Sequence, residues 1–473
     1  MKTPRLLAAV PALLLAASAH AQADAPATAG LDAATDPVLA GLIEESLAAR
    51  PELRQADANV RAEQERVPQA GALADPTLSL GLQNDGFDGL QIGKMETSFW
   101  QVMVTQPLPW PGKRDLRTDV ASAGARLAEA AAARVRLTVE ADVKRAYLEL
   151  ILVRDRLALL ARLEALWVKA QGSARTRYEA SEGAQSDLLR AQLEQNRLRQ
   201  RRWALRAEER TRLQALNRLR NHRLDEPLVT SRTVAQLGLP PLPEAEAALA
   251  DAERRSPELL EARLQVERAA SQVSLARRDR WPDLAVTAAI MPRGGLDPMW
   301  QAGLSVSLPI FSGRKQSRAV AEREARAAGA GSAAEAVREV LRLRVQDRLA
   351  LLESLLESAR IYQDGLLIQS RATADSTLSQ YRVGRVTFAS VLEAIGGVIG
   401  DEDGYLQTVA AAHRVAIATE EVSLDPAGGG GVAMGGGAVP GAGAIGGGSG
   451  GGGGGGSTPG AAEATTSSSM SKM

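Results

Sequence analysis

The sequence predicts a mainly α-helical protein with a small membrane β part, built from two tandem copies of a helix, β-hairpin, long helix and return helix. Three observations predict this fold: matching motifs in the two halves, a change of hydrophobic spacing within each half, and helices too long for a compact globular domain. Long stretches are dominated by Ala, Leu, Arg and Glu, which is typical of extended helices.

Charge and cysteine content exclude several classes of protein. The chain has 56 basic and 56 acidic side chains, so it offers no general attraction for nucleic acid, which we do not expect as a partner. It contains no cysteine, which excludes disulfides, thiolate metal sites and a lipid anchor at a lipobox. Stability must therefore come from burial and assembly.

The N-terminus has the features of a secretory signal peptide. Lys2 and Arg5 precede an apolar run, and Ala19-His20-Ala21 fits a small-x-small cleavage site. We therefore expect residues 1–21 to be removed and the mature chain to lie outside the cytoplasm. No later segment offers the roughly 20 apolar residues that a spanning helix requires, so integral attachment would need β-structure.

Matching motifs recur in the same order in both halves of the chain. They lie about 200 residues apart. The motifs are Pro-Glu-Leu at 51–53 and 257–259, Trp-Gln at 100–101 and 300–301, and Leu-Pro at 108–109 and 308–309. The sequence therefore predicts two homologous repeats, residues 36–235 and 245–424.

Each repeat is expected to contain one β-hairpin. After a helix at Pro51–Leu73, large apolar residues alternate with small or polar ones, beginning at Leu78. The second repeat shows the same alternation from Trp300 to Leu308, in the pattern of a membrane strand. Turn-rich segments at 84–97 and 292–298 separate the two strands of each repeat.

Long helices without proline follow the hairpins. They are expected at Arg114–Gln171 and Lys315–Tyr381, and each would span about 90–100 Å. The return helix of the first repeat, Asp187–Asn221, is too short to match the outgoing helix. We expect the helix at Pro51–Leu73 to supply the missing length, so that two stacked short helices pair with the long one.

Assembly must complete the membrane part. Four strands per chain are too few, because the smallest closed membrane barrels have about eight and an open sheet edge cannot face lipid. Three copies would supply twelve strands, and cyclic symmetry would join the long helices into a hollow cylinder. The sequence therefore favours a homotrimer in contact with outer-membrane lipid.

This order of elements after a signal peptide resembles the TolC family of outer-membrane efflux proteins, over roughly residues 36–424. The resemblance is carried by the junction Thr105–Arg114, its echo Ser307–Arg314, and helical tips near Tyr178 and Tyr381. The first junction is most similar to the heavy-metal branch, the CzcC-like and CusC-like channels.

The resemblance implies a TolC-like trimeric α-barrel plus a 12-stranded β-barrel, located in the outer membrane with a long periplasmic extension. It implies a passive exit duct in a tripartite efflux system. The partners would be a periplasmic adaptor (membrane fusion protein) and an inner-membrane transporter of the resistance-nodulation-division type. Heavy-metal cations are the expected cargo, and organic drugs are the alternative.

The resemblance also implies that the two tips dock the adaptor and gate the periplasmic mouth. In the first tip these roles fall on Tyr178, Gly183, Ser186, Asp187 and Leu188. In the second tip they fall on Tyr381, Gly384, Thr387, Ser390, Val391 and Leu392. Independently of the family, glycine permits a tight helix reversal, and Ser186 or Thr387 can cap the returning helix. Each residue could equally form a mere turn.

An acidic ring at the aperture is a further implication of the resemblance. Glu393, just beyond the second tip, is the first candidate, since a threefold carboxylate ring would favour cations. Asp401 and Asp403 are weaker candidates, because the simpler interpretation is that they are solvated charges on an exposed helix.

No residue constellation indicates an enzyme, a metal site or a cofactor. His222 and His413 lie in opposite repeats without neighbouring ligands and are expected to be surface or junction residues. A periplasmic coiled-coil adaptor or scaffold is the rival class, but it should carry one helical hairpin rather than two repeats with β-hairpins. Residues 426–473 are mostly Gly, Ala and Ser and are expected to be a disordered tail.

Overall fold

The computed structural model describes Leu31 and residues 35–426, all of which belong to the first of two units, Met1–Gly429. The predicted signal peptide lies outside the described residues, and so does the predicted Gly-rich tail except for Pro426.

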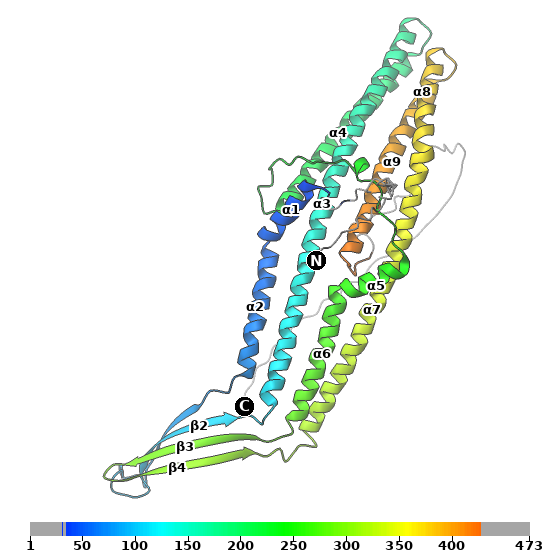
Figure 1. Cartoon of the computed structure of the whole chain (residues 1–473). Helices are drawn as coiled ribbons and strands as arrows, with labels where there is room; N and C mark the ends of the chain where they lie inside the picture. The colour runs from blue at the N-terminus through cyan, green and yellow to red at the C-terminus, as the bar shows by residue number, and fades with distance from the viewer. Residues whose placement is uncertain (1–30, 32–34, 427–473) are drawn as a thin grey trace, which may run out of the picture. The chain divides into compact units, whose positions relative to one another are not determined.

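Both repeats contain the predicted series of elements (Figure 1). The first consists of α1 (Pro37–Ala49), α2 (Pro51–Gly71), β1 (Thr77–Gln83), β2 (Phe99–Leu108), α3 (Lys113–Glu179) and α4 (Gln185–Leu219). A linker with a 3-10 turn, η1 (Val234–Gln236), leads to the second. That repeat consists of α5 (Ala245–Arg255), α6 (Pro257–Arg278), β3 (Asp283–Arg293), β4 (Leu296–Ser307), α7 (Gln316–Ile361), the π-helical turn η2 (Tyr362–Leu366), α8 (Leu367–Arg382) and α9 (Phe388–Glu420).

Proline starts the short helix that precedes each hairpin. Pro51 and Pro257 occupy the first positions of α2 and α6, where a missing N–H costs nothing. The residues before them, Arg50 and Ser256, are extended, as a following proline requires, and therefore separate these helices from α1 and α5. Ser256 also caps α6 by accepting a hydrogen bond from the Leu259 amide at 3.2 Å.

The four strands form one antiparallel sheet in the order β1-β2-β3-β4. Each repeat supplies one hairpin, as predicted, and pairing of β2 with β3 joins the two repeats. The prediction for the second turn was wrong in extent: β3 and β4 run into the segment 292–298 and leave only Gly294-Gly295 between them. Gly294 has a φ of 68°, so the glycine permits this shorter turn.

One face of the sheet is apolar and exposed across all four strands. The pairing aligns Leu80, Val102, Ile290 and Trp300 in one row. Each of these side chains is 41–79% exposed. A second row aligns Leu78 and Val104 with two alanines. The alternation seen in single strands thus builds a continuous apolar surface.

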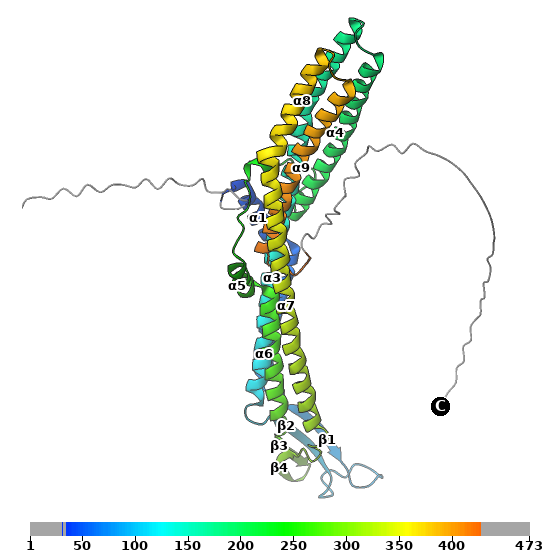
Figure 2. The same ribbon diagram turned by 90° about the vertical axis from the view of Figure 1, so that its right-hand side faces the viewer.

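In each repeat, two shorter helices pack against the long helix that follows the hairpin (Figures 1 and 2). Helices α2 and α4 both pack against α3, as predicted, and α6 and α9 pack against α7. Helix α3 also contacts α6 and α9 and so connects the repeats. One prediction was wrong: Lys315–Tyr381 is not a single helix, because η2 separates α7 from α8 without any proline.

The main core lies where α1, α3, α4 and α9 meet. Its buried side chains include Leu39, Ile151, Leu216 and Val409, one from each of these helices. Ion pairs between helices surround it, such as Lys144 with Glu420 at 2.7 Å. None of the helices between residues 35 and 426 is both long and apolar enough to cross a membrane.

A buried lysine joins the strand-to-helix junctions of the two repeats. Lys113 Nζ donates to the Trp281 carbonyl and to Asp283 Oδ1, both at 2.9 Å. The indole rings of Trp110 and Trp281 stack with centroids 5.3 Å apart. Gly112, which precedes α3, has a φ of 85°, a conformation that favours glycine. The junction motif therefore fixes how both hairpins leave the helices.

Candidate functional site

The first tip reverses direction between α3 and α4. Ser181 adopts a left-handed conformation with a φ of 60°, and the amides of Glu182 and Gly183 donate to the Arg177 carbonyl at 2.8 and 2.9 Å. A Cβ on Gly183 would lie 3.0 Å from the Arg177 Cβ and 3.1 Å from the Tyr178 nitrogen. A side chain at Gly183 would therefore be crowded by the end of α3, whereas Ser181 provides the left-handed turn.

The second tip turns on Gly384, whose φ is 74°. Its amide donates to the Tyr381 carbonyl at 3.0 Å. Thr387 then caps α9, because its hydroxyl accepts from the Ser390 amide at 3.4 Å, which confirms the predicted cap. The cap predicted at Ser186 was wrong: α4 already begins at Gln185, so Ser186 lies within its first turn.

Tyr381 joins the two tips. Its phenol donates to Asp187 Oδ2 of the first tip at 3.1 Å. Arg177, also of the first tip, lies 5.2 Å above the Tyr381 ring and donates to the Tyr381 carbonyl. We call this set of contacts among Arg177, Asp187 and Tyr381 the tip lock.

Burial keeps the phenol of Tyr381 in its neutral form. Tyr381 is only 2% exposed, and its ring packs against Phe388 at a centroid distance of 5.2 Å. This burial, together with the negative charge of Asp187, raises the pKa of Tyr381 to about 12. The phenol is therefore a hydrogen-bond donor throughout the physiological pH range.

The remaining predicted tip residues differ in how deeply they are buried. Val391 is fully buried in an apolar cluster with Trp167, Phe388 and Ile395. Asp187, Leu188, Ser390, Leu392 and Gly183 are half-buried, whereas Ser186, Gly384 and Thr387 are exposed. Tyr178 is 43% exposed, unlike Tyr381, although the two occupy equivalent places in the repeats.

The three acidic candidates lie in different environments on α9. Glu393 is exposed and has no ion-pair partner in the described part of the chain. Asp403 is 8% exposed and accepts from Arg156 Nε at 2.7 Å and from Arg201 at 3.4 Å, so the expectation of a solvated charge was wrong there. Asp401 is half-buried.

Sequence reasoning missed Arg177 and Glu402. Glu402 pairs with Arg371 at 2.7 Å and with Arg162 at 3.6 Å. Arg177 is one of many arginines in α3, and Glu402 is one of several acidic residues in α9, so neither charge carries a distinguishing signal in the sequence. Trp167 and Phe388 could have been noticed, because aromatic residues are rare in this chain.

His222 follows α4 and His413 lies in α9, and neither belongs to a group of metal-ligating side chains among the described residues. His413 is 1% exposed rather than at the surface, because it packs under the linker with Nε2 donating to the Gly238 carbonyl at 3.0 Å. Burial lowers the pKa of His413, against the opposing effect of this hydrogen bond. His222 is half-exposed beside Glu226.

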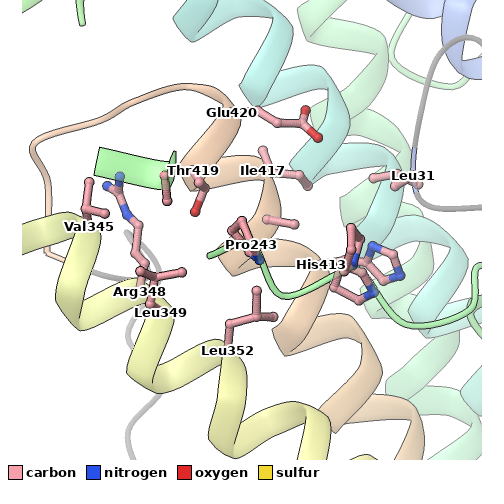
Figure 3. Close-up of a pocket in the computed structure, with 14 residues that line it drawn as sticks. Leu31, Pro243, Val345, Arg348, Leu349, Leu352, His413, Ile417, Thr419 and Glu420 are labelled. Atoms are coloured by element: carbon pink, nitrogen blue, oxygen red, sulfur yellow. The ribbon is translucent and has the colours of Figure 1, made fainter. Parts of the chain in front are cut away.

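A cavity of about 330 Å³ lies beside His413 between α7, α9 and the linker (Figure 3). Its lining is mainly apolar, with Pro243, Leu352 and Ile417 among the side chains. Arg348 also lines it but donates to the Ser423 carbonyl. Residues 35–426 contain no group of three or more His, Cys, Asp or Glu side chains that could hold a metal ion.

Comparison with known proteins finds a matching family model and similar solved structures. The model of the family described as "Outer membrane efflux protein" matches residues 42–222 and 248–421. A search of the curated proteins found no match.

Among solved structures, the outer-membrane channel OprN is similar with a TM-score of 0.68 at 20% identity, over 82% of this chain and 90% of that one. CusC is similar with a TM-score of 0.69 at 17% identity, over 82% and 91%. VceC from Vibrio cholerae gives a TM-score of 0.67 at 18% identity, over 82% and 96%. These likenesses show the fold. Since the family model covers most of both repeats, the chain belongs to the outer membrane efflux protein family.

Proposed function

We propose that this chain is the passive exit duct of a tripartite efflux system in the outer membrane, and that its cargo is heavy-metal cations. A member of this family is an efflux channel rather than an enzyme. The observation that carries the membrane part of the proposal is the exposed apolar face shared by all four strands. Such a face is stable only against lipid or another apolar surface.

Three copies of the chain form the complete duct in this proposal. In the described chain, β1 and β4 each pair on one side only, so each leaves an edge for a neighbouring copy. Pairing β4 of one copy with β1 of the next closes three sheets into a 12-stranded barrel, which removes every edge exposed to lipid.

Complementary helix faces support the same closure in the helical part. On α4, Leu189, Leu193 and Trp203 lie on one exposed stripe at coiled-coil spacing. Arg199 and Arg210 flank this stripe and have no acidic partner among the described residues. We call it the α4 stripe.

The opposite edge of the helical part offers a matching surface. Ile368 on α8 is 62% exposed, and the exposed Asp364 and Asp375 lie near it without a basic partner in the described chain. We propose that the α4 stripe of one copy packs against α8 of the next. Arginine against aspartate then fixes the order of copies around the ring.

The tips gate the periplasmic mouth and dock the adaptor in this proposal. The tip lock holds the two tips together, and we assign this arrangement to the closed state of the periplasmic mouth. The exposed residues Tyr178, Ser186, Gly384 and Thr387 are available to an adaptor. Glu393, exposed and unpaired in the described chain, is the proposed aperture acid.

The domain boundaries follow from the repeats. We propose a signal peptide at 1–21, repeats at 36–235 and 245–424, and a Gly-rich tail from 426. The two stretches that match the family model, 42–222 and 248–421, support the repeat boundaries.

The cargo rests on the resemblance of the junction Thr105–Arg114 to the heavy-metal branch. The described chain offers no three-residue metal site, so the duct conducts the cation and the inner-membrane transporter selects it. A deletion strain tests this on panels of metals and hydrophobic drugs, with complementation by the full chain.

Hypersensitivity to metals alone supports the proposal. Hypersensitivity to drugs alone would assign the duct to a multidrug system. If neither changed and the protein were absent from outer membranes, a periplasmic scaffold would replace the duct as the best account.

A further inference from the structure

The cavity between α7, α9 and the linker has the size and lining of a small-molecule site (Figure 3). Its volume of about 330 Å³ lies at the lower end of the range for such sites in proteins. Val345, Leu349 and Leu352 line it from one face of α7, since they are spaced by three or four residues. Ile417 of α9 and Pro243 of the linker also line it. The cavity therefore fits a compact apolar body.

One cation in the cavity wall has no acidic partner in the described chain. Arg348 is 3% exposed and donates to two backbone carbonyls, those of Ser423 and Asp425. Its Nε atom is buried and has no hydrogen-bond partner among residues 35–426. A buried charge without a counter-ion is unfavourable. Arg348 therefore marks a place where a bound anion would be stabilised.

The acidic side chains nearby are held by other cations. Glu420 lines the cavity, but its carboxylate pairs with Lys144 at 2.7 Å. The next acid, Glu421, pairs with Arg134 at 3.0 Å. Burial lowers the pKa of the Arg348 guanidinium, against the opposing charge of Glu421, but an arginine remains protonated at neutral pH. Arg348 thus supplies a positive charge that no side chain of the described wall neutralises.

The other polar groups of the wall are already engaged. His413 lies across the cavity from Arg348 in Figure 3, and its Nε2 atom is bonded to the Gly238 carbonyl at 3.0 Å. The hydroxyl of Thr419 donates to the Val415 carbonyl within α9 at 2.9 Å. The prolines of the linker have no backbone N–H to offer. Among the described lining residues, the guanidinium is therefore the donor that remains for a ligand.

We propose that this cavity binds a small monocarboxylate with an apolar body. Its carboxylate accepts from Arg348, and its body packs against Leu349, Leu352 and Ile417. One guanidinium balances one negative charge, so a monoanion suits the site better than a phosphate dianion. The site goes beyond the proposed duct, because it lies away from both tips and its occupancy does not depend on transport.

Equilibrium dialysis of the purified full-length protein in lipid nanodiscs tests the site, with empty nanodiscs measured to subtract binding to lipid. The probes are 4-phenylbutyrate and 4-phenylbutyramide, which have the same number of non-hydrogen atoms and differ in charge. We expect 4-phenylbutyrate to bind once per protomer. The amide should bind at least about ten-fold more weakly, because a hydrogen bond between charged partners is stronger than one to a neutral group.

Two arginine substitutions distinguish binding from a structural role. Arg348→Met removes the cation and should weaken 4-phenylbutyrate at least about ten-fold while leaving the amide unchanged. Arg344→Met is the matched control. Arg344 lies one turn earlier on α7 and also holds the segment after α9, by donating to the Leu424 carbonyl at 3.0 Å, but it does not line the cavity. This control should bind both probes as the wild-type protein does.

A cavity-filling substitution gives a second test that keeps Arg348 in place. Ala416 is half-buried and lines the cavity from α9, so Ala416→Trp should exclude both probes. It covers the case in which Arg348→Met fails to fold. Circular dichroism shows whether each variant retains its helices.

The site is wrong if wild-type protein binds no 4-phenylbutyrate beyond empty nanodiscs, or if the two probes bind equally well. It is also wrong if folded Arg348→Met keeps its affinity, or if Arg344→Met loses affinity as fully, since the arginines would then act only by holding the chain. Binding that persists in folded Ala416→Trp would place the ligand outside this cavity. Dialysis involves no transport, so a protein that binds the carboxylate but conducts nothing would contradict the proposed function and leave the site standing.

Discussion

At the scale of single residues, equivalent positions in the two repeats have taken different roles. Tyr178 and Tyr381 occupy the same place in the duplication, yet Tyr178 is 43% exposed and Tyr381 is 2% exposed. The buried copy holds Asp187 and Arg177, so one tyrosine of the pair connects both tips. A duplicated motif thus marks where a tip lies, while burial decides which copy carries the contact.

Helix capping at the tips gives a prediction for one residue in each repeat. Thr387→Ala removes the cap of α9 and should cost about 1 kcal/mol at that helix end. Faster amide hydrogen exchange in the first turn of α9 would report the loss. Ser186→Ala is the matched control and should leave exchange at the start of α4 unchanged, because Ser186 does not cap it. Equal effects of the two substitutions would contradict the assignment.

The raised pKa of Tyr381 predicts how the tip lock depends on pH. Its folded value of about 12 exceeds the value of about 10 expected for an unfolded tyrosine. The contribution of Tyr381 to stability is therefore complete below about pH 10 and is lost between about pH 10 and 12.

Titration of the tyrosinate absorbance measures the ionisation of the tyrosines and so tests this prediction. Burial also raises the pKa of Tyr147, which stays in the variant. Wild-type protein should therefore show one more late-titrating tyrosine than Tyr381→Phe, while the closed state stays unchanged from pH 7 to 9. Ionisation of Tyr381 near pH 10 in the folded protein would contradict its burial in the tip lock.

At the scale of elements, the sequence was sufficient for most of the fold. Proline at 51 and 257, alternation in the strands and uninterrupted helical spacing predicted the hairpins, the long helices and the stacking of α2 and α4 on α3. The π turn could not be predicted, since it arises without proline and keeps helical spacing on either side. The contacts of Asp403 with Arg156 and Arg201 were hidden as well, because they connect segments about 200 or more residues apart.

The ion pairs of Asp403 on α9 predict that Asp403 contributes more to stability than the nearby Asp401. Asp403→Asn removes the charge that faces Arg156 in a largely buried site, which should cost about 2 kcal/mol and lower the melting temperature. Asp401→Asn is the control, since Asp401 has no ion pair in the described chain, and should change stability by less than about 0.5 kcal/mol. Thermal unfolding followed by circular dichroism distinguishes the two. Equal melting temperatures for the two variants would contradict the role of Asp403.

At the scale of the whole molecule, the repeats are joined at several levels. Strands β2 and β3 pair in the sheet, Lys113 and the stacked tryptophans connect the junctions, and the tip lock connects the tips. Within one copy, the exposed apolar sheet face, the two sheet edges and the α4 stripe remain without partners in the described chain. In our proposal, lipid covers the sheet face and neighbouring copies cover the edges and the stripe.

The α4 stripe predicts the effect of substitutions on assembly. Trp203→Glu places a charge in the proposed contact between copies and should shift the purified protein from trimer toward monomer in detergent, as measured by light scattering after gel filtration. Val229→Glu is the control, because Val229 is 84% exposed in the linker and lies outside the stripe. If Trp203→Glu stayed trimeric, helix α4 would not form the contact between copies.

The measurement that tests the central claim most directly is the conductance of the purified full-length protein in a planar lipid bilayer. We predict that wild-type protein inserts as a trimer and gives uniform, small conductance steps, because the tip lock narrows the periplasmic mouth. Tyr381→Phe removes the bond to Asp187 and should raise the unitary conductance several-fold, while Tyr178→Phe, at the exposed equivalent position, should leave it unchanged. Discrete steps that grow only when the lock is released would support a gated outer-membrane duct. Absence of any unitary conductance from correctly folded trimers would contradict it.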